Sequence, residues 1–97
     1  MPYRILKSKN SLEDNRFKSI SDFKWCMKCG GEVEIEWNGI HYGIIRYGTD
    51  DKITIYVWNC PETEYCFNTA DDALEYMVGS DRLRDVITQV TVLDRSI

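Results

Sequence analysis

Four cysteines have the residue type and the spacing of a metal site. Cys26 and Cys29 enclose two residues and precede Gly30–Gly31, the kind of turn with which many zinc ribbons hold two thiolate ligands. Cys60 and Cys66 follow roughly thirty residues later, at a spacing wider than that of a usual second zinc knuckle. In the simpler interpretation, Cys26 is a small apolar core residue and Cys29 is an ordinary residue of a helix's last turn. We favour free thiols and no cofactor, and keep a zinc-stapled structural module as the alternative.

A redox dithiol is a weaker interpretation of the same pair. Reactive cysteines usually sit at the start of a helix, where the helix dipole lowers the thiol pKa. Here Cys26 and Cys29 fall at the end of a predicted helix, where the dipole acts in the opposite direction. We therefore expect no disulfide chemistry from them.

His41 is the only histidine and the residue best suited to acid–base chemistry. In the strand register that the turns set, His41 lies opposite Glu36 and beside Trp58. A carboxylate beside an imidazole can form a general base. However, the sequence places no nucleophile next to it, so we interpret the pair as a surface cross-strand contact. The prediction is a protein without catalytic activity.

Glutamates alternate with apolar residues over 32–37, so their carboxylates share one face of a strand. The same register places aromatic side chains of the neighbouring strands on that face, together with Ile45. Aromatic side chains rimmed by acids have the composition of a protein interface, whereas a helix packed there would make the face a second buried layer. Both alternatives stay open. The predicted partner-binding residues are Glu34, Glu36, His41, Tyr56 and Trp58.

A three-stranded antiparallel meander positions these residues. Strict alternation predicts a half-buried strand over 32–37, and Asn38-Gly39 is the pair best suited to a two-residue turn with positive φ. The return strand spans 40–47, a turn follows at 48–51, and a third strand spans 52–58. Both turns give the same apolar face, through the pairs Trp37–Ile40, Ile35–Tyr42, Val33–Ile44, Ile44–Ile55 and Tyr42–Val57.

A helix is predicted before the meander. Ser19 can cap a helix over about 20–29, with Asp22 returning the bond and Gly30–Gly31 ending the helix. Further towards the N-terminus, 3–6 could form a short strand, and the polar stretch up to residue 16 is expected to be a partly mobile connection.

The remaining elements follow the meander. We predict a short strand over 65–67, a helical turn around Leu83 and a final strand over 89–93. Ser80 or Asp81 can cap that helical turn. Between them, a helix capped by Asn68 or Thr69 carries the apolar stripe Ala70, Ala73, Leu74, Met77 and Val78. An N-terminal helix, a three- to four-stranded antiparallel meander, C-terminal helices and a final strand define an α+β fold.

Composition limits the function classes. The 97 residues are 43% hydrophobic and 29% charged, which suits a single small domain over 1–97. A net charge of −4, with basic residues gathered only near the N-terminus, disfavours direct nucleic-acid binding and allows a basic protein partner or self-association. No apolar run approaches the length of a membrane span and no secretory signal opens the chain, so we expect a cytoplasmic protein.

Several motifs of this sequence recur together elsewhere. The strand Glu-Val-Glu-Ile-Glu-Trp at 32–37 with Asn38-Gly39, and the segments 41–44, 68–71 and 82–87, resemble small uncharacterised proteins of Gram-positive bacteria and of their phages or mobile elements. The resemblance spans roughly residues 17–93 and rests on turn and core positions. It implies a fold and a regulatory, inhibitory or accessory setting, no specific activity, and no dependence on a cysteine cluster.

Overall fold

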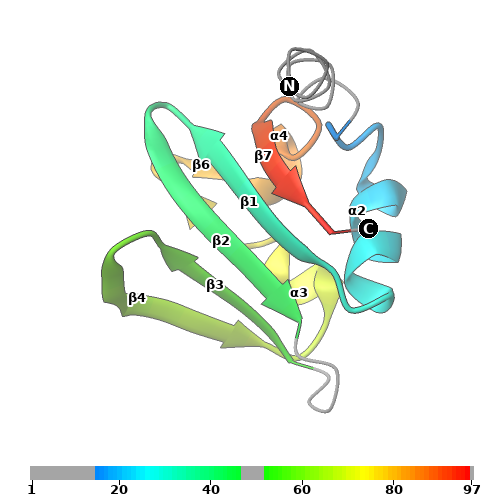
Figure 1. Cartoon of the computed structure of the whole chain (residues 1–97), viewed down its shortest axis with the longest axis horizontal. Helices are drawn as coiled ribbons and strands as arrows, with labels where there is room; N and C mark the ends of the chain where they lie inside the picture. Colours follow the sequence, from blue (N-terminus) through cyan, green and yellow to red (C-terminus); the bar gives the residue numbers. More distant parts are fainter. Residues whose placement is uncertain (1–14, 47–51, 97) are drawn as a thin grey trace, which may run out of the picture.

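A computed structural model describes residues 15–46 and 52–96. Within these residues, five antiparallel strands form one sheet in the order β4-β3-β2-β1-β7, and a short hairpin of β5 and β6 lies apart from it (Figure 1). The predicted α+β class with an antiparallel sheet is confirmed. The elements are α2 (Ile20–Lys28), β1 (Glu32–Trp37), β2 (Ile40–Arg46), β3 (Ile53–Val57), β4 (Cys60–Phe67), α3 (Ala70–Ala73), β5 (Met77–Val78), β6 (Asp81–Arg82), α4 (Leu83–Val86) and β7 (Thr91–Arg95).

The register of the meander is the predicted one. Asn38 and Gly39 form the two-residue turn between β1 and β2, with φ angles of 53° and 81°. The apolar cross-strand pairs are all present, namely Trp37–Ile40, Ile35–Tyr42, Val33–Ile44, Ile44–Ile55 and Tyr42–Val57. The turn expected at 48–51 lies outside the described residues.

Helix α2 begins with the expected cap. The Asp22 N–H donates to Ser19 Oγ at 3.1 Å, as in a capping box. The carboxylate of Asp22 accepts a bond from the Lys18 N–H at 3.1 Å, one residue before the position that the box predicts.

The end of α2 is a Schellman motif. The Gly30 N–H donates to the Met27 carbonyl and the Gly31 N–H to the Cys26 carbonyl, at 3.1 and 3.0 Å. Gly30 has a φ of +78°, and a Cβ on Gly31 would lie 2.5 Å from Cys26 Sγ. The sequence Cys-x-x-Cys-Gly-Gly is therefore a helix terminus, because each glycine meets a backbone requirement of the chain's exit from α2.

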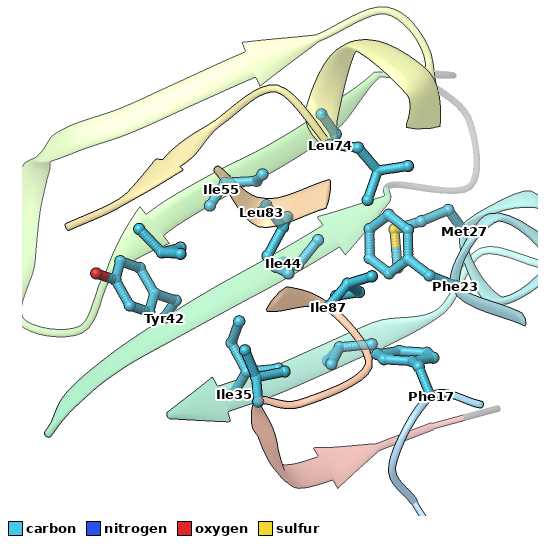
Figure 2. Packing of buried hydrophobic residues seen from close by; sticks show 14 of the residues in the cluster. Phe17, Phe23, Met27, Ile35, Tyr42, Ile44, Ile55, Leu74, Leu83 and Ile87 are labelled. Atoms are coloured by element: carbon cyan, nitrogen blue, oxygen red, sulfur yellow. The ribbon is translucent and has the colours of Figure 1, made fainter. Parts of the chain in front are cut away.

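All three described helices cover one face of the sheet and bury a common core (Figure 1). In Figure 2, Phe23 and Met27 of α2 lie with Leu74 and Leu83 over the strands. The strand residues beneath them are Ile35, Tyr42, Ile44 and Ile55. The opposite face, which we call the outer face, carries none of the described helices.

Strand β4 is longer than predicted. We expected a strand only over 65–67, after a connection at 59–64, but β4 begins at Cys60. Asn59 adopts a φ of +62°, so the turn between β3 and β4 needs only two residues. An irregularity follows, in which Thr63 Oγ1 accepts the Val57 N–H at 2.8 Å. Pro61 is tolerated because β4 is an edge strand of the described sheet.

The helix predicted over 70–78 is wrong beyond its first turn. Thr69 caps it as expected, but α3 ends at Ala73. The carbonyls of Leu74 and Tyr76 accept bonds from the N–H groups of Arg84 and Leu83, both at 2.8 Å. These long-range bonds replace the helical ones, so Val78 joins a hairpin and Met77 points to solvent.

The predicted helical turn around Leu83 is present as α4, but its proposed cap is wrong. Neither Ser80 nor Asp81 caps it, because residue 81 begins β6 and Arg82 occupies the N-cap without a side-chain bond. Asp81 instead accepts a bond from the Trp37 indole N–H at 2.9 Å, which attaches the small hairpin to β1.

Strand β7 completes the sheet beside β1. It starts two residues later than the predicted 89–93. Asp94 pairs with Glu34 and Val92 with Ile35, so Leu93 is an extra residue in a bulge. Because of this bulge, Val92 faces the core and Asp94 faces the outer face.

Arg95 joins β7 to α2. Its guanidinium donates to the Asp22 carboxylate at 2.7 Å and to the Asn15 carbonyl at 3.0 Å. It also lies over the Phe17 ring, 4.4 Å from the centroid. The hydrogen bond from Arg95 is the main reason why the pKa of Asp22 is lowered from its ordinary value.

The expectations for 3–6 and for most of the stretch to residue 16 lie outside the described residues. Among the helices described, none is long and apolar enough to cross a membrane.

Candidate functional site

The outer face carries the five predicted partner-binding residues in two rows across the sheet. In one row, Glu34 of β1 lies opposite Gly43 of β2, which in turn pairs with Tyr56 of β3. In the other row, Glu36 lies opposite His41 as predicted, and Trp58 follows directly after β3.

A shallow hollow of about 210 Å³ opens on this face. Its lining includes residues of the four strands β7, β1, β2 and β3. We call it the acidic hollow, because three of its side chains are carboxylates, and the other two are aliphatic and aromatic. These five side chains are Glu32, Glu34, Asp94, Ile45 and Tyr56.

The acidic hollow contains a pair of like charges. Glu34 and Asp94 occupy directly opposite positions of β1 and β7. Two carboxylates at such positions repel each other and destabilise the strand pair. Glu32 adds a third carboxylate at the same site. A cation bound here would turn this repulsion into attraction.

Tyr56 is held beside the hollow by a glycine. A Cβ on Gly43 would overlap the far end of the Tyr56 ring, so the ring lies against the Gly43 backbone. The ring remains half-buried and also lines the hollow. The predicted covering of Gly43 by an aromatic side chain is confirmed.

His41 and Trp58 form an exposed aromatic pair at one end of the face. Their rings meet edge to face with centroids 5.9 Å apart, and 39% of Trp58 is exposed. The Trp58 N–H donates to the His41 carbonyl at 3.0 Å, which holds the turn against β2. This pair gives the face an apolar contact beside its acids.

Sequence reasoning missed Asp94 and left Glu32 and Ile45 out of the predicted site. Asp94 lay beyond the predicted final strand, and only the bulge in β7 brings it opposite Glu34. Glu32 and Ile45 were placed on the correct face by alternation, and their pairing beside the hollow follows from the same register.

The structure separates the four cysteines. Cys26 is buried in the core under α2, Cys29 is exposed at its C-cap, and Cys60 is half-buried at the start of β4. Cys66 is exposed on the outer face, 3.5 Å from Thr54 Oγ1. Among the described residues, no three side chains of the metal-binding types gather at one point. The donor set of the zinc alternative is therefore not assembled.

Cys26 also has the environment of a core residue. Burial is the main reason why its thiol pKa is raised, which opposes formation of the reactive thiolate.

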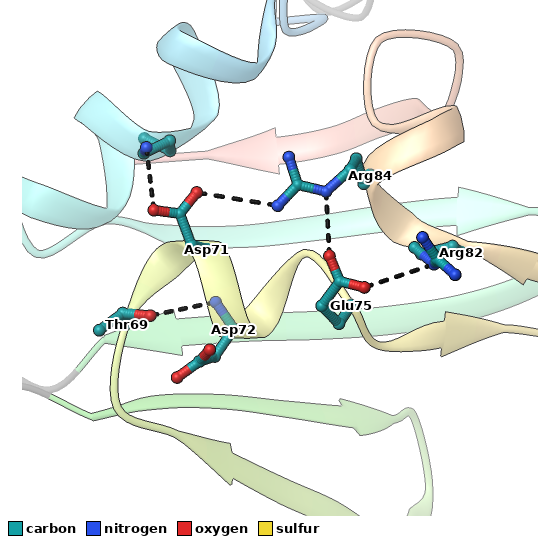
Figure 3. A network of polar contacts seen from close by, with 7 residues as sticks. Thr69, Asp71, Asp72, Glu75, Arg82 and Arg84 are labelled. Atoms are coloured by element: carbon teal, nitrogen blue, oxygen red, sulfur yellow. Dashed lines mark hydrogen bonds and ion pairs between the residues drawn. The ribbon is translucent and has the colours of Figure 1, made fainter.

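A chain of ion pairs lies on the helix side, away from the acidic hollow (Figure 3). Arg84 contacts Glu75 at 3.0 Å and Asp71 at 3.8 Å, and Arg82 contacts the other oxygen of Glu75 at 3.4 Å. Lys24 of α2 reaches Asp71 at 3.1 Å. These contacts connect α2, α3 and α4 at the surface, so we interpret them as structural.

Comparisons with models of protein families, with curated proteins and with solved structures give no match for this chain. The resemblance to proteins of Gram-positive bacteria and mobile elements therefore stays a prediction.

Proposed function

We propose that this protein is a non-catalytic binding domain whose outer face takes up a lysine- or arginine-rich segment of another protein. The observation that carries the proposal is the acidic hollow, where Glu34 and Asp94 face each other beside Glu32. Such an arrangement is unfavourable in the free domain and becomes favourable when a cation lies between the carboxylates.

The side chains of the hollow match a long basic residue in more than charge. Ile45 and Tyr56 offer apolar surface to the methylene stem of a lysine or arginine, while the carboxylates accept bonds from its charged head. Trp58 and His41 supply aromatic contacts for the flanking residues of the same segment, and Glu36 lies opposite His41 in that row.

Self-association through this face is less favoured. A symmetric dimer would bring the acidic hollow of one copy towards that of the other, and like-charged surfaces suppress such a contact. We therefore infer a different, basic protein as the partner. The regulatory role and the cytoplasmic location expected from the sequence stay predictions.

The experiment is a titration of the ¹⁵N-labelled full chain with a peptide of alternating arginine and serine residues, at low salt. Backbone shifts are expected at Glu34, Ile45 and Asp94. The double variant E34Q/D94N should bind the peptide about five- to tenfold more weakly, which is about 1 kcal/mol. A peptide with citrulline in place of arginine should not bind, because it keeps the shape and loses the charge.

The matched control is E62Q/E64Q on β4, which changes the net charge equally at exposed sites outside the hollow. It should retain the affinity of the unmodified protein. If it weakens binding as much as E34Q/D94N, or if the citrulline peptide binds equally well, the proposed site is wrong.

A further inference from the structure

A larger groove lies on the helix side of the molecule, apart from the outer face. It runs between α2 and the connection from β4 to α3, and its volume is about 520 Å³. Pockets for small molecules span ~300–1,000 Å³, so the space suits one ligand. We call it the α2 groove; the residues that matter here are Lys24, Trp25, Lys28, Arg46, Thr69 and Asp71.

The α2 groove is basic although the chain carries a net charge of −4. Its ionisable lining consists of three cations and one carboxylate, Asp71. That carboxylate is matched by Lys24 at 3.1 Å and by Arg84 at 3.8 Å. The positive charge of Lys28 and Arg46 therefore exceeds the negative charge in the groove.

Arg46 and Lys28 are held close together. The Arg46 guanidinium donates to the Lys28 carbonyl at 3.1 Å, at the C-terminal end of α2. This bond satisfies a carbonyl that the helix leaves without an internal partner. It also fixes a guanidinium at the mouth of the groove, where a phosphate or carboxylate could be bound by two neighbouring cations.

Trp25 supplies an aromatic surface beside these cations. It is 57% exposed, whereas the other large side chains of α2, Phe23 and Met27, are buried in the core. An exposed indole lining a groove can stack on a planar ring, and such stacking contributes about 1–3 kcal/mol in nucleobase complexes. Packing within the described fold does not require it there.

We propose that the α2 groove binds a small anion that carries an aromatic ring, the chemistry of a nucleoside monophosphate. The ring stacks on Trp25 and the phosphate contacts Lys28 and Arg46. Ser21, Asn68 and Thr69 line the same space with hydroxyl and amide groups for the sugar. This site shares no residue with the acidic hollow, so the two proposals stand or fall separately.

The test is a titration of the ¹⁵N-labelled full chain with adenosine monophosphate, and separately with adenosine and with inorganic phosphate. The Trp25 indole N–H and the backbone of 68–70 should shift in a saturable manner with the nucleotide. Adenosine and phosphate should each bind at least about tenfold more weakly, because each makes only part of the contacts.

Variants locate the site. W25A and K28Q should each lower the affinity for the nucleotide about fivefold or more. The matched controls W58A, which removes an exposed indole from the outer face, and K18Q, which precedes α2, should leave the affinity unchanged. Circular dichroism melting checks that all four variants are folded.

Three outcomes would overturn the proposal. Adenosine monophosphate gives no saturable shift up to about 10 mM, which corresponds to a negligible affinity. Inorganic phosphate binds as tightly as the nucleotide, which leaves no role for Trp25. The control variants lose as much affinity as W25A and K28Q.

Discussion

Asp94 and Glu34 show how a single pair of residues can mark a surface for recognition. Each carboxylate alone would be an unremarkable solvated side chain of a strand. Their direct opposition across β7 and β1 is unfavourable, and a small domain has little stability to lose. Residues that lower the stability of a fold in this way are typical of functional sites.

The first prediction is that D94N makes the free protein more stable. Removing one of two facing charges should raise the free energy of unfolding by about 0.5 kcal/mol at low salt. Thermal melting at low ionic strength measures this effect, and added salt should shrink it. E62Q, an exposed charge change on β4, should leave the melting temperature unchanged within error. A lower melting temperature for D94N would contradict the repulsion.

The second prediction concerns Asp22. Its pKa is lowered in the folded state by the bond from Arg95, so its contribution to stability is present above the unfolded pKa of about 3.9. That contribution is lost as the pH falls through the lowered folded pKa. Urea unfolding between about pH 6 and pH 2.5 should show this loss in the unmodified chain. D22N should be less stable at neutral pH and should show a smaller loss on acidification.

D85N provides the comparison for Asp22, because Asp85 is an exposed carboxylate of α4. It should keep the pH dependence of the unmodified protein. If D22N and D85N have the same acid profile, the Asp22–Arg95 pair does not cause it.

At the scale of elements, hairpins with short turns were predictable and connections with tertiary backbone bonds were not. The register of β1, β2 and β3 followed from Asn38-Gly39 and alternation, because these are local properties. The end of α3 depends on bonds from Leu83 and Arg84, which no helical pattern contains. The bulge that places Asp94 is likewise a property of the β1–β7 pairing.

The cysteine motif teaches a related lesson. The spacing Cys-x-x-Cys-Gly-Gly fits a zinc knuckle, and it fits the terminus of α2 equally well. Sequence reasoning favoured the helix because Ile20, Phe23 and Met27 recur at helical spacing before it. The outer-face residues were found for the same reason, since alternation is enough to assign a face.

The third prediction tests the end of α2. G31A should lower the free energy of unfolding by about 1–3 kcal/mol, because its Cβ would lie 2.5 Å from Cys26 Sγ and 2.9 Å from the Cys26 carbonyl oxygen. C29S, an exposed change two residues earlier, should stay within about 0.5 kcal/mol. Urea denaturation compares the two. A stable G31A would show that the contact with Cys26 is loose.

The whole molecule distributes its four thiols over different environments, which gives the fourth prediction. With a thiol reagent such as Ellman's reagent, exposed Cys29 and Cys66 should react first and half-buried Cys60 more slowly. Cys26 should react only at the rate of global unfolding, since it lies in the core. A zinc chelator should leave the melting temperature unchanged. Protection of all four thiols, lifted by the chelator, would contradict the separation of the cysteines.

The place of β7 has a consequence for how the chain is made. Its neighbour β1 leaves the ribosome long before β7, because the meander, α3, the small hairpin and α4 are all synthesised in between. At about 5–20 residues per second, that interval lasts several seconds. During it the nascent chain presents the unpaired edge of β1, and Asp22 lacks Arg95. Translation speed and chaperones that shield open strand edges should therefore govern the yield of this small protein.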